Sequence, residues 1–289
     1  MRRTDLFSPV WHRFRRSKLA VIALIYIALV SLIALFAPLI ATDGAKALVP
    51  YAPNDPNLVD RLQPPNAAHR LGTDDLGRDI LSRMIHGARV SLTIGLTATL
   101  IALIVGSLLG ALAGYYGGAI DWIVSRLIEI VLCFPFLFLV LGIVALFRPS
   151  MATLMVALGL TSWTTEARFV RGEFLRIREL EFAQAARASG ARDARIIFRH
   201  LLPNAFAPVL VASSFGVAAA ILTESALSFL GVGVQIPTAS WGSILASAEQ
   251  NIDYAWWMVV FPGLAIFLTV AAFNVIGDRF RDALDPRFE

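Results

Sequence analysis

The sequence predicts an all-α membrane protein with six transmembrane helices and a helical hairpin on the cytoplasmic side. Three observations support this fold class. Hydrophobic residues make up 57% of the 289-residue chain and charged residues only 16%, against about a quarter charged in soluble domains. The apolar residues gather in uninterrupted runs long enough to cross a bilayer, which needs about 20 helical residues. The Lys and Arg residues are also distributed unevenly between the loops.

The six apolar runs are expected to cross the membrane at about residues 19–40, 90–114, 122–147, 151–163, 206–233 and 255–276. The first run is longer than the apolar core of a cleaved signal peptide, about 7–15 residues, so it is expected to be a retained helix. In the second run, Gly106, Gly110 and Gly114 recur every four residues and favour close approach of a neighbouring helix. In the third run, Pro135 is expected to kink the helix.

The basic residues predict the orientation. Six precede residue 19, eight lie between Arg168 and Arg199, and three follow residue 278. Cytoplasmic loops are enriched in Lys and Arg, so both termini are expected in the cytoplasm. The chain then divides into a cytoplasmic segment with the first helix (1–41), an external loop with an amphipathic helix (42–89), a five-helix core (90–276) and a cytoplasmic tail (277–289). The hairpin occupies about 166–204 of the core. The net charge of +4 is read as fixing this orientation, and no nucleic-acid partner is expected.

The internal segment is predicted to form two helices around Gly190. The stretch 166–189 is rich in helix formers, and Val170, Phe174 and Ile177 form an apolar stripe. Gly190 suits a left-handed helix stop, and a second helix at about 192–201 is expected to end before Pro203. Small residues beside the turn would let the hairpin enter a groove on another protein, with Arg187 and Arg192 meeting acidic groups at its rim. A solvated loop on the membrane surface is the open alternative.

Charged groups inside the predicted spans are candidate functional residues. Arg126 and Glu129, three residues apart, are expected to neutralise each other near the cytoplasmic end of the third span. Glu224, followed by Ser225, lies deeper in the fifth span. It either lines a pathway or anchors a helix contact, and the sequence favours neither.

Several chemistries find no support. The only two lysines, Lys18 and Lys46, are followed by Leu and Ala, whereas a phosphate-binding P-loop needs Lys before Ser or Thr. No ATP site, catalytic site or metal site is therefore expected in this chain. The acidic residues between 74 and 79 lack the spacing of a calcium loop, and Thr73 or Asp74 is instead predicted to cap the external helix.

The hairpin sequence resembles the cytoplasmic loop of binding-protein-dependent ABC importer permeases, whose pattern is E-A-A-x3-G-x9-I-x-L-P. The spacing is kept, with Gln in the Glu place and His in the Ile place. The matching residues are Gln184, Ala185, Ala186, Gly190, His200, Leu202 and Pro203. The Gln removes a negative charge and so any salt bridge at that position.

Three further stretches are similar to the C-type permeases of dipeptide and oligopeptide importers. They lie at 69–92 (HRLGTDDLGRDILSRMIHGARVSL), 224–233 (ESALSFLGVG) and 272–286 (AFNVIGDRFRDALDP). The resemblance implies the type I ABC importer permease fold in a bacterial inner membrane. It implies a second homologous permease, two P-loop ATPases that hold ATP and Mg, and an external solute-binding protein. The cargo implied is short peptides, or in related branches glutathione, nickel or another small solute.

Two other classes of protein remain as alternatives. An ion-coupled secondary transporter is expected to place acidic groups or broken helices at the midplane, where this sequence offers only Glu224. A seryl intramembrane protease needs Ser and His within the spans, and none of the four histidines falls inside one.

Overall fold

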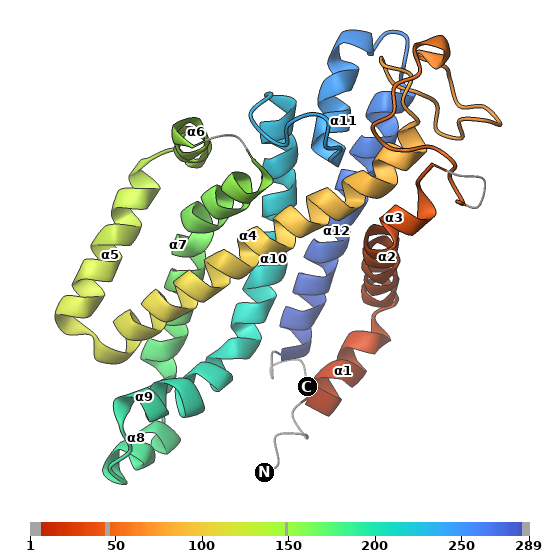
Figure 1. Ribbon diagram of the computed structural model, residues 1–289. Coiled ribbons are helices and arrows are strands. Elements are labelled where there is room, and N and C mark those ends of the chain that lie inside the picture. Colours follow the sequence, from red (N-terminus) through yellow and green to blue (C-terminus); the bar gives the residue numbers. More distant parts are fainter. Residues whose placement is uncertain (1–6, 44–46, 148–149, 285–289) are drawn as a thin grey trace.

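The computed structural model describes residues 7–43, 47–147 and 150–284 (Figure 1). Within these ranges the chain is helical, with only two isolated β-bridges between loop residues. The helices are α1 (Phe7–Arg16), α2 (Lys18–Leu35), α3 (Ala37–Ile40), η1 (Leu58–Asp60), α4 (Ile80–Tyr116), α5 (Gly118–Cys133), α6 (Phe136–Leu146), α7 (Met151–Ile177), α8 (Glu181–Ala188), α9 (Asp193–Arg195), the π-helical η2 (Ile196–Leu201), α10 (Leu202–Phe229), α11 (Trp241–Ala248), η3 (Glu249–Asn251) and α12 (Trp257–Leu284). The predicted all-α class is confirmed.

Four segments of the described chain are long and apolar enough to cross a membrane: α2, α4, residues Pro208–Phe229 of α10, and α12. Helices α5 and α6 are long and apolar enough to cross a membrane only when they are taken together. The predicted fourth span, 151–163, is the first part of α7, and the polar residues that follow it, including Glu166 and Arg168, lower the hydropathy of the helix. The six-span count is therefore not fully confirmed, although α7 packs along α4 and α10 within the bundle.

Helix α4 combines two elements that the sequence analysis separated. The predicted external helix and the second span form one continuous helix of 37 residues. Asp79 caps it, because its Oδ1 accepts a hydrogen bond of 2.8 Å from the backbone N–H of Ser82. The prediction of Thr73 or Asp74 as the cap is wrong: Asp74 pairs with Arg78, and the Thr73 hydroxyl donates to the Asp60 carbonyl.

The seam between α4 and α7 depends on the three predicted glycines. A Cβ atom at Gly106 would lie 2.5 Å from the Glu166 Cβ, one at Gly110 2.4 Å from the Ala167 carbonyl oxygen, and one at Gly114 2.6 Å from the Phe174 Cβ. Any side chain at these positions would separate the helices. The prediction that small residues permit close packing here is confirmed.

The third predicted span is broken rather than kinked. Helices α5 and α6 meet at an angle of 89°. Phe134 adopts an extended conformation, φ −90° and ψ 133°, as expected for a residue before proline. Pro135 has no N–H to continue the helix. The break turns α6 across the top of α7 in Figure 1.

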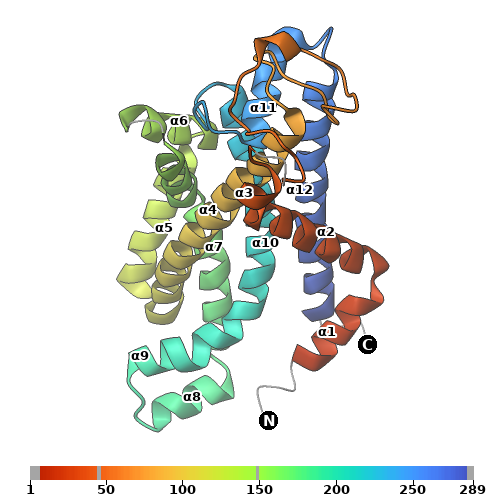
Figure 2. The same cartoon turned by 45° about the vertical axis from the view of Figure 1, so that its right-hand side comes forward.

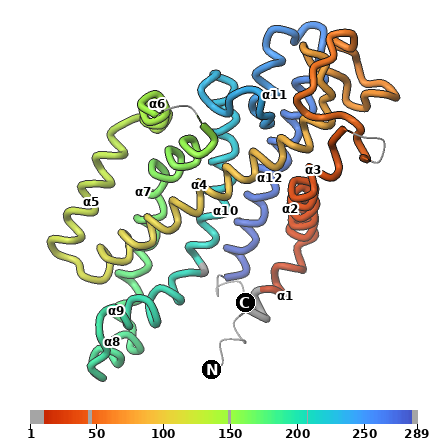
Figure 3. The backbone as a smooth tube through the Cα atoms, in the orientation of Figure 1, coloured from red at the N-terminus to blue at the C-terminus, as the bar shows by residue number. Residues whose placement is uncertain are grey.

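The elements are divided between two ends of the bundle. Helices α8 and α9 lie at the same end as α1 and the last turns of α12, and Figure 2 shows the same arrangement from another side. The segment 47–79 and α11 lie at the opposite end, and Figure 3 traces α4 from that end to α5. Five basic residues of the sequence lie outside the described residues: Arg2, Arg3, Lys46, Arg148 and Arg287.

Candidate functional site

The hairpin is a continuation of the bundle rather than a separate unit. Residues 166–177, predicted to begin a cytoplasmic helix, are the last turns of α7, and a bend at 178–180 separates them from α8. The prediction of one unbroken helix from 166 to 189 is therefore wrong. Helix α8 carries the first of the predicted coupling residues, namely Gln184, Ala185, Ala186 and Arg187.

Gly190 ends α8 in the predicted left-handed conformation, with φ +71°. Its N–H donates to the Arg187 carbonyl at 2.9 Å, and the N–H of Ala191 donates to the Ala186 carbonyl at 3.1 Å. This pair of bonds is a Schellman motif, which satisfies carbonyls at the end of a helix. A Cβ atom at Gly190 would meet nothing within 4 Å, so glycine is favoured here by backbone conformation and not by crowding.

The root of the hairpin is fixed to α4 and α7 by packing and by polar contacts. Ala183 is buried against a cluster that includes Val170, Phe174, Ile177, Ile196, Ile197 and Leu201. Arg178 donates to the Gly114 carbonyl at 2.9 Å. The Tyr115 hydroxyl donates to the Asp193 carboxylate at 2.7 Å. Movement of the hairpin would therefore be passed directly to α4 and α7.

Further along α7, a charged contact joins it to α5. The Arg171 Nη2 atom donates to the Asp121 carboxylate at 2.8 Å, and its Nε forms a second contact with the same group. Two parallel donors on one carboxylate fix the guanidinium in one orientation. This contact ties the start of α5 to the part of α7 that leads into the hairpin.

The tip of the hairpin is open to its surroundings. Gln184, Ala185 and Arg192 are exposed there, and nearer the root the aromatic side chains of Phe182 (39%) and Phe198 (55%) are exposed as well. Arg187 is exposed as well, and its guanidinium lies 5.1 Å from the centre of the Tyr115 ring. Large aromatic residues, small alanines and basic residues thus share the exposed part.

Gln184, which stands where the family pattern has Glu, makes a hydrogen bond within the hairpin. The Gln184 Nε2 atom donates to the Glu179 carbonyl at 3.0 Å. An ionised Glu only accepts hydrogen bonds and could not make this contact. The Gln184 amide therefore stabilises the bend before α8, which a glutamate carboxylate at this position could not do.

The second half of the hairpin does not end before Pro203 as predicted. Residues 193–201 pass without interruption into α10, and Pro203 is the second residue of α10. Pro203 is exposed, while His200 and Leu202 are partly buried. The segment that contains His200, η2, is a π-helix. This uncommon geometry frequently marks functional sites.

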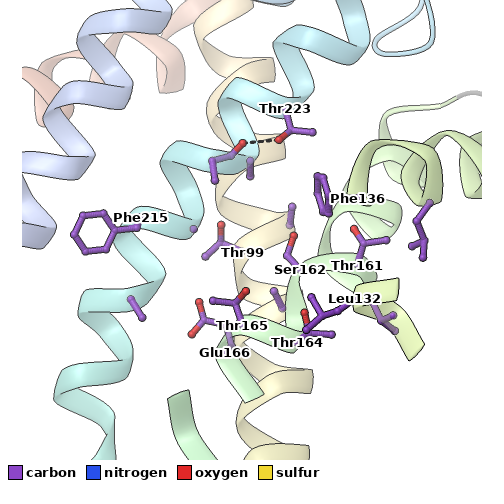
Figure 4. A pocket seen from close by; sticks show the side chains of 18 of the residues that line it. Thr99, Leu132, Phe136, Thr161, Ser162, Thr164, Thr165, Glu166, Phe215 and Thr223 are labelled. Atoms are coloured by element: carbon purple, nitrogen blue, oxygen red, sulfur yellow. Dashed lines mark hydrogen bonds between the residues drawn. The ribbon is translucent and has the colours of Figure 1, made fainter. Parts of the chain in front are cut away.

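A cavity of about 500 Å³ opens among α4, α7, α10 and the α5–α6 break (Figure 4). Its apolar lining includes Leu132, Phe134, Phe136, Leu139 and Phe215. Its polar lining consists of Thr99, Thr161, Ser162, Thr164, Thr165, Glu166 and Thr223. Cavities that bind small molecules combine an apolar wall with a few polar groups in this way, at about 300–1,000 Å³.

The predicted intramembrane charges lie away from this cavity. Glu224 is fully buried and accepts hydrogen bonds from Ser228 at 2.8 Å and Ser91 at 3.2 Å. The Ser91 hydroxyl also accepts from the backbone N–H of Trp241, so the cluster joins α10 to α4 and α11. These contacts are those of a helix anchor. The adjacent Ser225 donates to the Ile221 carbonyl within its own helix.

Arg126 and Glu129 form an ion pair on α5, as the spacing predicted, and both side chains are more than half exposed. Neither residue lines the cavity. Their contact is the local one that residues three apart on a helix make.

Sequence reasoning missed Glu166, because it placed this residue at the start of the cytoplasmic segment. In the structure Glu166 is 4% exposed, faces the cavity and lies opposite Gly106 of α4. A usable signal was present: Thr161, Ser162, Thr164 and Thr165 precede it at the end of an apolar run. Such a cluster of small hydroxyl side chains beside one acidic residue indicates a polar face within a bundle.

The long apolar helices, the cavity and the exposed hairpin are the features of a membrane-embedded transport subunit. Residues 106–289 match the family model described as the binding-protein-dependent transport system inner membrane component. Residues 6–65 match the N-terminal transmembrane domain of oligopeptide transport permease C. The chain therefore belongs to the family of binding-protein-dependent transport system inner membrane components.

Curated relatives are similar to this chain over nearly its whole length. It is 44% identical over 277 residues to the dipeptide transport system permease protein of Alkalihalophilus pseudofirmus, covering 96% of this chain and 88% of the relative. It is 38% identical over 283 residues to the oligopeptide transport system permease protein of Bacillus subtilis, covering 98% and 90%. Among solved structures, the inward-facing methionine ABC transporter MetNI gives a TM-score of 0.57 at 20% identity, covering 70% of this chain and 96% of that one. The fold is that of an ABC importer permease.

Proposed function

We propose that this chain is the transmembrane permease subunit of an ATP-driven importer of short peptides. It forms half of the translocation pathway, with a second homologous permease as the other half. Two P-loop ATPase subunits dock on the hairpins, and an external solute-binding protein delivers the cargo. The relatives that transport dipeptides and oligopeptides support this choice of cargo.

The hairpin carries the proposal. Its tip exposes small residues, and Phe182 and Phe198 are exposed nearer its root; exposed aromatic groups on such a surface favour an interface. Its root is held to α4 by Arg178 and by the Tyr115–Asp193 hydrogen bond. Helix α7 runs without a break from the hairpin to the cavity residues Glu166 and Thr161. A push on the hairpin by a closing ATPase pair would shift α7 and open the cavity to one side or the other.

ATP and Mg belong to the partners in this proposal, and the chain itself is not an enzyme. Its two lysines lie outside any P-loop pattern. The described residues hold no group of three His, Cys, Asp or Glu side chains placed to bind a metal ion. The energy for transport therefore has to arrive through the docked hairpin.

The proposed docking of the ATPases on the hairpin also sets the orientation of the chain in the membrane. The hairpin lies at the same end of the bundle as α1 and the last turns of α12 (Figure 1). If ATPases dock there, this end faces the cytoplasm, both termini lie inside, and the segment 47–79 with α11 faces the binding protein. The seventeen basic residues predicted on the cytoplasmic side agree with that assignment.

Reconstitution tests the proposal. The chain, a second homologous permease and the two ATPases are placed in liposomes with loaded binding protein outside, and uptake of radiolabelled dipeptide, oligopeptide, glutathione and nickel is measured with and without ATP. We expect ATP-dependent uptake of the peptides. Uptake of glutathione or nickel alone would show that the cargo is not a short peptide. Ion-driven uptake without the ATPases would support a secondary transporter instead.

A further inference from the structure

The cavity contains a carboxylate that the described chain leaves without a partner. Glu166 is 4% exposed, and its Oε2 atom is buried and accepts no hydrogen bond from any described residue. Figure 4 shows it beside Thr165 and Thr99, on the side of α7 that faces α10. An ionised carboxylate removed from water is strongly unfavourable unless it is paired.

Glu224 shows how the same fold treats a structural carboxylate. It is as deeply buried as Glu166, but it accepts hydrogen bonds from the hydroxyls of Ser91 and Ser228. Buried polar groups in proteins are nearly always satisfied in this way. An unsatisfied one at a cavity wall is therefore placed for a ligand rather than for stability.

Four of the six hydroxyl groups around the cavity present acceptors and not donors. Thr99, Thr161, Ser162 and Thr223 each donate to a carbonyl of their own helix at 2.8 Å. A hydroxyl has one proton and two lone pairs, so each retains only lone pairs for another contact. The described lining residues include no Lys, Arg or His. Lone pairs and one negative charge together favour a cationic group rich in N–H donors.

We propose that Glu166 binds the α-ammonium group of the peptide cargo while it crosses the cavity. This inference rests on the proposed peptide transport and adds a named site to it. Every short peptide with a free amino terminus carries this group largely protonated near pH 7, since its pKa is about 7.7–8.0. It supplies three N–H donors to the carboxylate and the hydroxyl oxygens. The aromatic and aliphatic wall contacts the rest of the peptide without selecting a particular side chain.

The first test uses the reconstituted four-subunit complex with saturating loaded binding protein. Glu166→Gln keeps the shape and removes the charge, and Glu166→Asp keeps the charge. We expect Glu166→Gln to lower the maximal uptake rate about tenfold, the loss expected for one charge-assisted hydrogen bond. The binding-protein concentration for half-maximal uptake should not change. We expect Glu166→Asp to stay within about threefold of the wild type by the same scale.

Thermal stability and subunit composition separate this role from two others. Removing an uncompensated buried charge should leave the melting temperature of the Glu166→Gln complex unchanged or raised. Loss of the second permease from that complex would assign the carboxylate to a basic side chain across the interface and overturn the inference. Normal uptake by Glu166→Gln, which imitates a protonated Glu, would overturn it as well. Absence of ATP-driven uptake in the wild type would instead refute the proposed function.

A binding measurement tests the ammonium group directly. Radiolabelled alanyl-alanine is bound to the nucleotide-free complex without binding protein, and unlabelled competitors are added. We expect displacement by alanyl-alanine but not by N-acetyl-alanyl-alanine, and at least tenfold weaker retention by Glu166→Gln. Equal displacement by both dipeptides would contradict the assignment.

Discussion

The two ends of the helix bundle differ in where their charged groups lie: one end buries them in ion pairs, and the other exposes them. At the end formed by 47–79 and α11, the buried Asp74 carboxylate lies 2.7 Å from Arg78 Nε and 3.4 Å from Arg83 Nε. His69 Nδ1 lies 2.9 Å from the helix-capping Asp79. At the hairpin end, the root is fixed, but residues 184–195 are exposed except for two partly buried alanines.

Under the proposed function, this difference separates a rigid joint from the element on which the ATPases dock. Buried ion pairs with fixed geometry lock the first end into one arrangement, since breaking them leaves charges without partners. The hairpin tip is held only through its root and offers side chains that nothing in the described chain covers. The comparison predicts that substitutions at the first end affect stability, whereas substitutions at the hairpin tip affect partners and transport.

The largest effect is expected from Asp74→Asn. The substitution keeps the shape but leaves Arg78 and Arg83, which are 7% and 2% exposed, without their shared counter-charge. Breaking a buried pair costs about 3–5 kcal/mol. Thermal unfolding of the purified complex should show a large loss of stability. Asp75→Asn is the matched control, since its side chain is 35% exposed, and it should cost no more than about 1 kcal/mol. Equal effects would remove the distinction between the ends.

A smaller effect is expected in the seam that connects the two ends. The methyl group of Gly110→Ala would lie 2.4 Å from the Ala167 carbonyl oxygen, so α4 and α7 must separate. Overpacking of this kind costs about 1–3 kcal/mol, and uptake should fall because the hairpin and the cavity share this seam. Gly142→Ala in α6, where a Cβ meets nothing within 4 Å, should be neutral or stabilising. A stable, fully active Gly110→Ala complex would refute the close packing.

The turn of the hairpin should respond to backbone preference alone. At φ +71°, Gly190→Ala places a Cβ in the left-handed region, at a cost of about 1–2 kcal/mol. Gly190→Asn tolerates that region better. We expect reduced ATPase recovery and reduced uptake for the Ala variant, and retention of both for the Asn variant. If the two variants behave alike, the turn geometry does not matter for docking.

The smallest change in stability is expected at the hairpin surface. Phe198→Ser removes a side chain that is 55% exposed, so the melting temperature should hardly move, within about 0.5 kcal/mol. Recovery of the ATPase subunits during purification should nevertheless fall sharply. Val59→Ser, which removes an exposed apolar side chain at the opposite end, should leave ATPase recovery intact. Normal recovery with Phe198→Ser would place the docking surface elsewhere.

Local sequence rules accounted for the features that depend on local chemistry. The left-handed stop at Gly190 and the glycine seam at Gly106, Gly110 and Gly114 follow from the absence of a Cβ atom. The pair of Arg126 and Glu129 follows from helical spacing. The apolar runs predicted the long helices because the bilayer demands that length.

The features that sequence reasoning missed depend on tertiary contacts. Asp79 caps α4 because Asp74 and Thr73 are engaged elsewhere, which their order in the chain does not reveal. The 89° break at Pro135 is larger than a proline kink because α6 turns over α7. Glu166 stays in the bundle because α4 offers a glycine opposite it. Its hydrophilic neighbours otherwise resemble the start of a loop.

Cross-linking tests the central claim most directly. In a Cys133→Ser background, which removes the only cysteine, Ala185→Cys at the hairpin tip or Val59→Cys at the opposite end is labelled with a photoactivated cross-linker in native membranes. The docking account predicts an adduct with the P-loop ATPase from position 185 and none from position 59. No ATPase adduct from position 185, or equal adducts from both positions, would contradict the assignment of the hairpin as the coupling element.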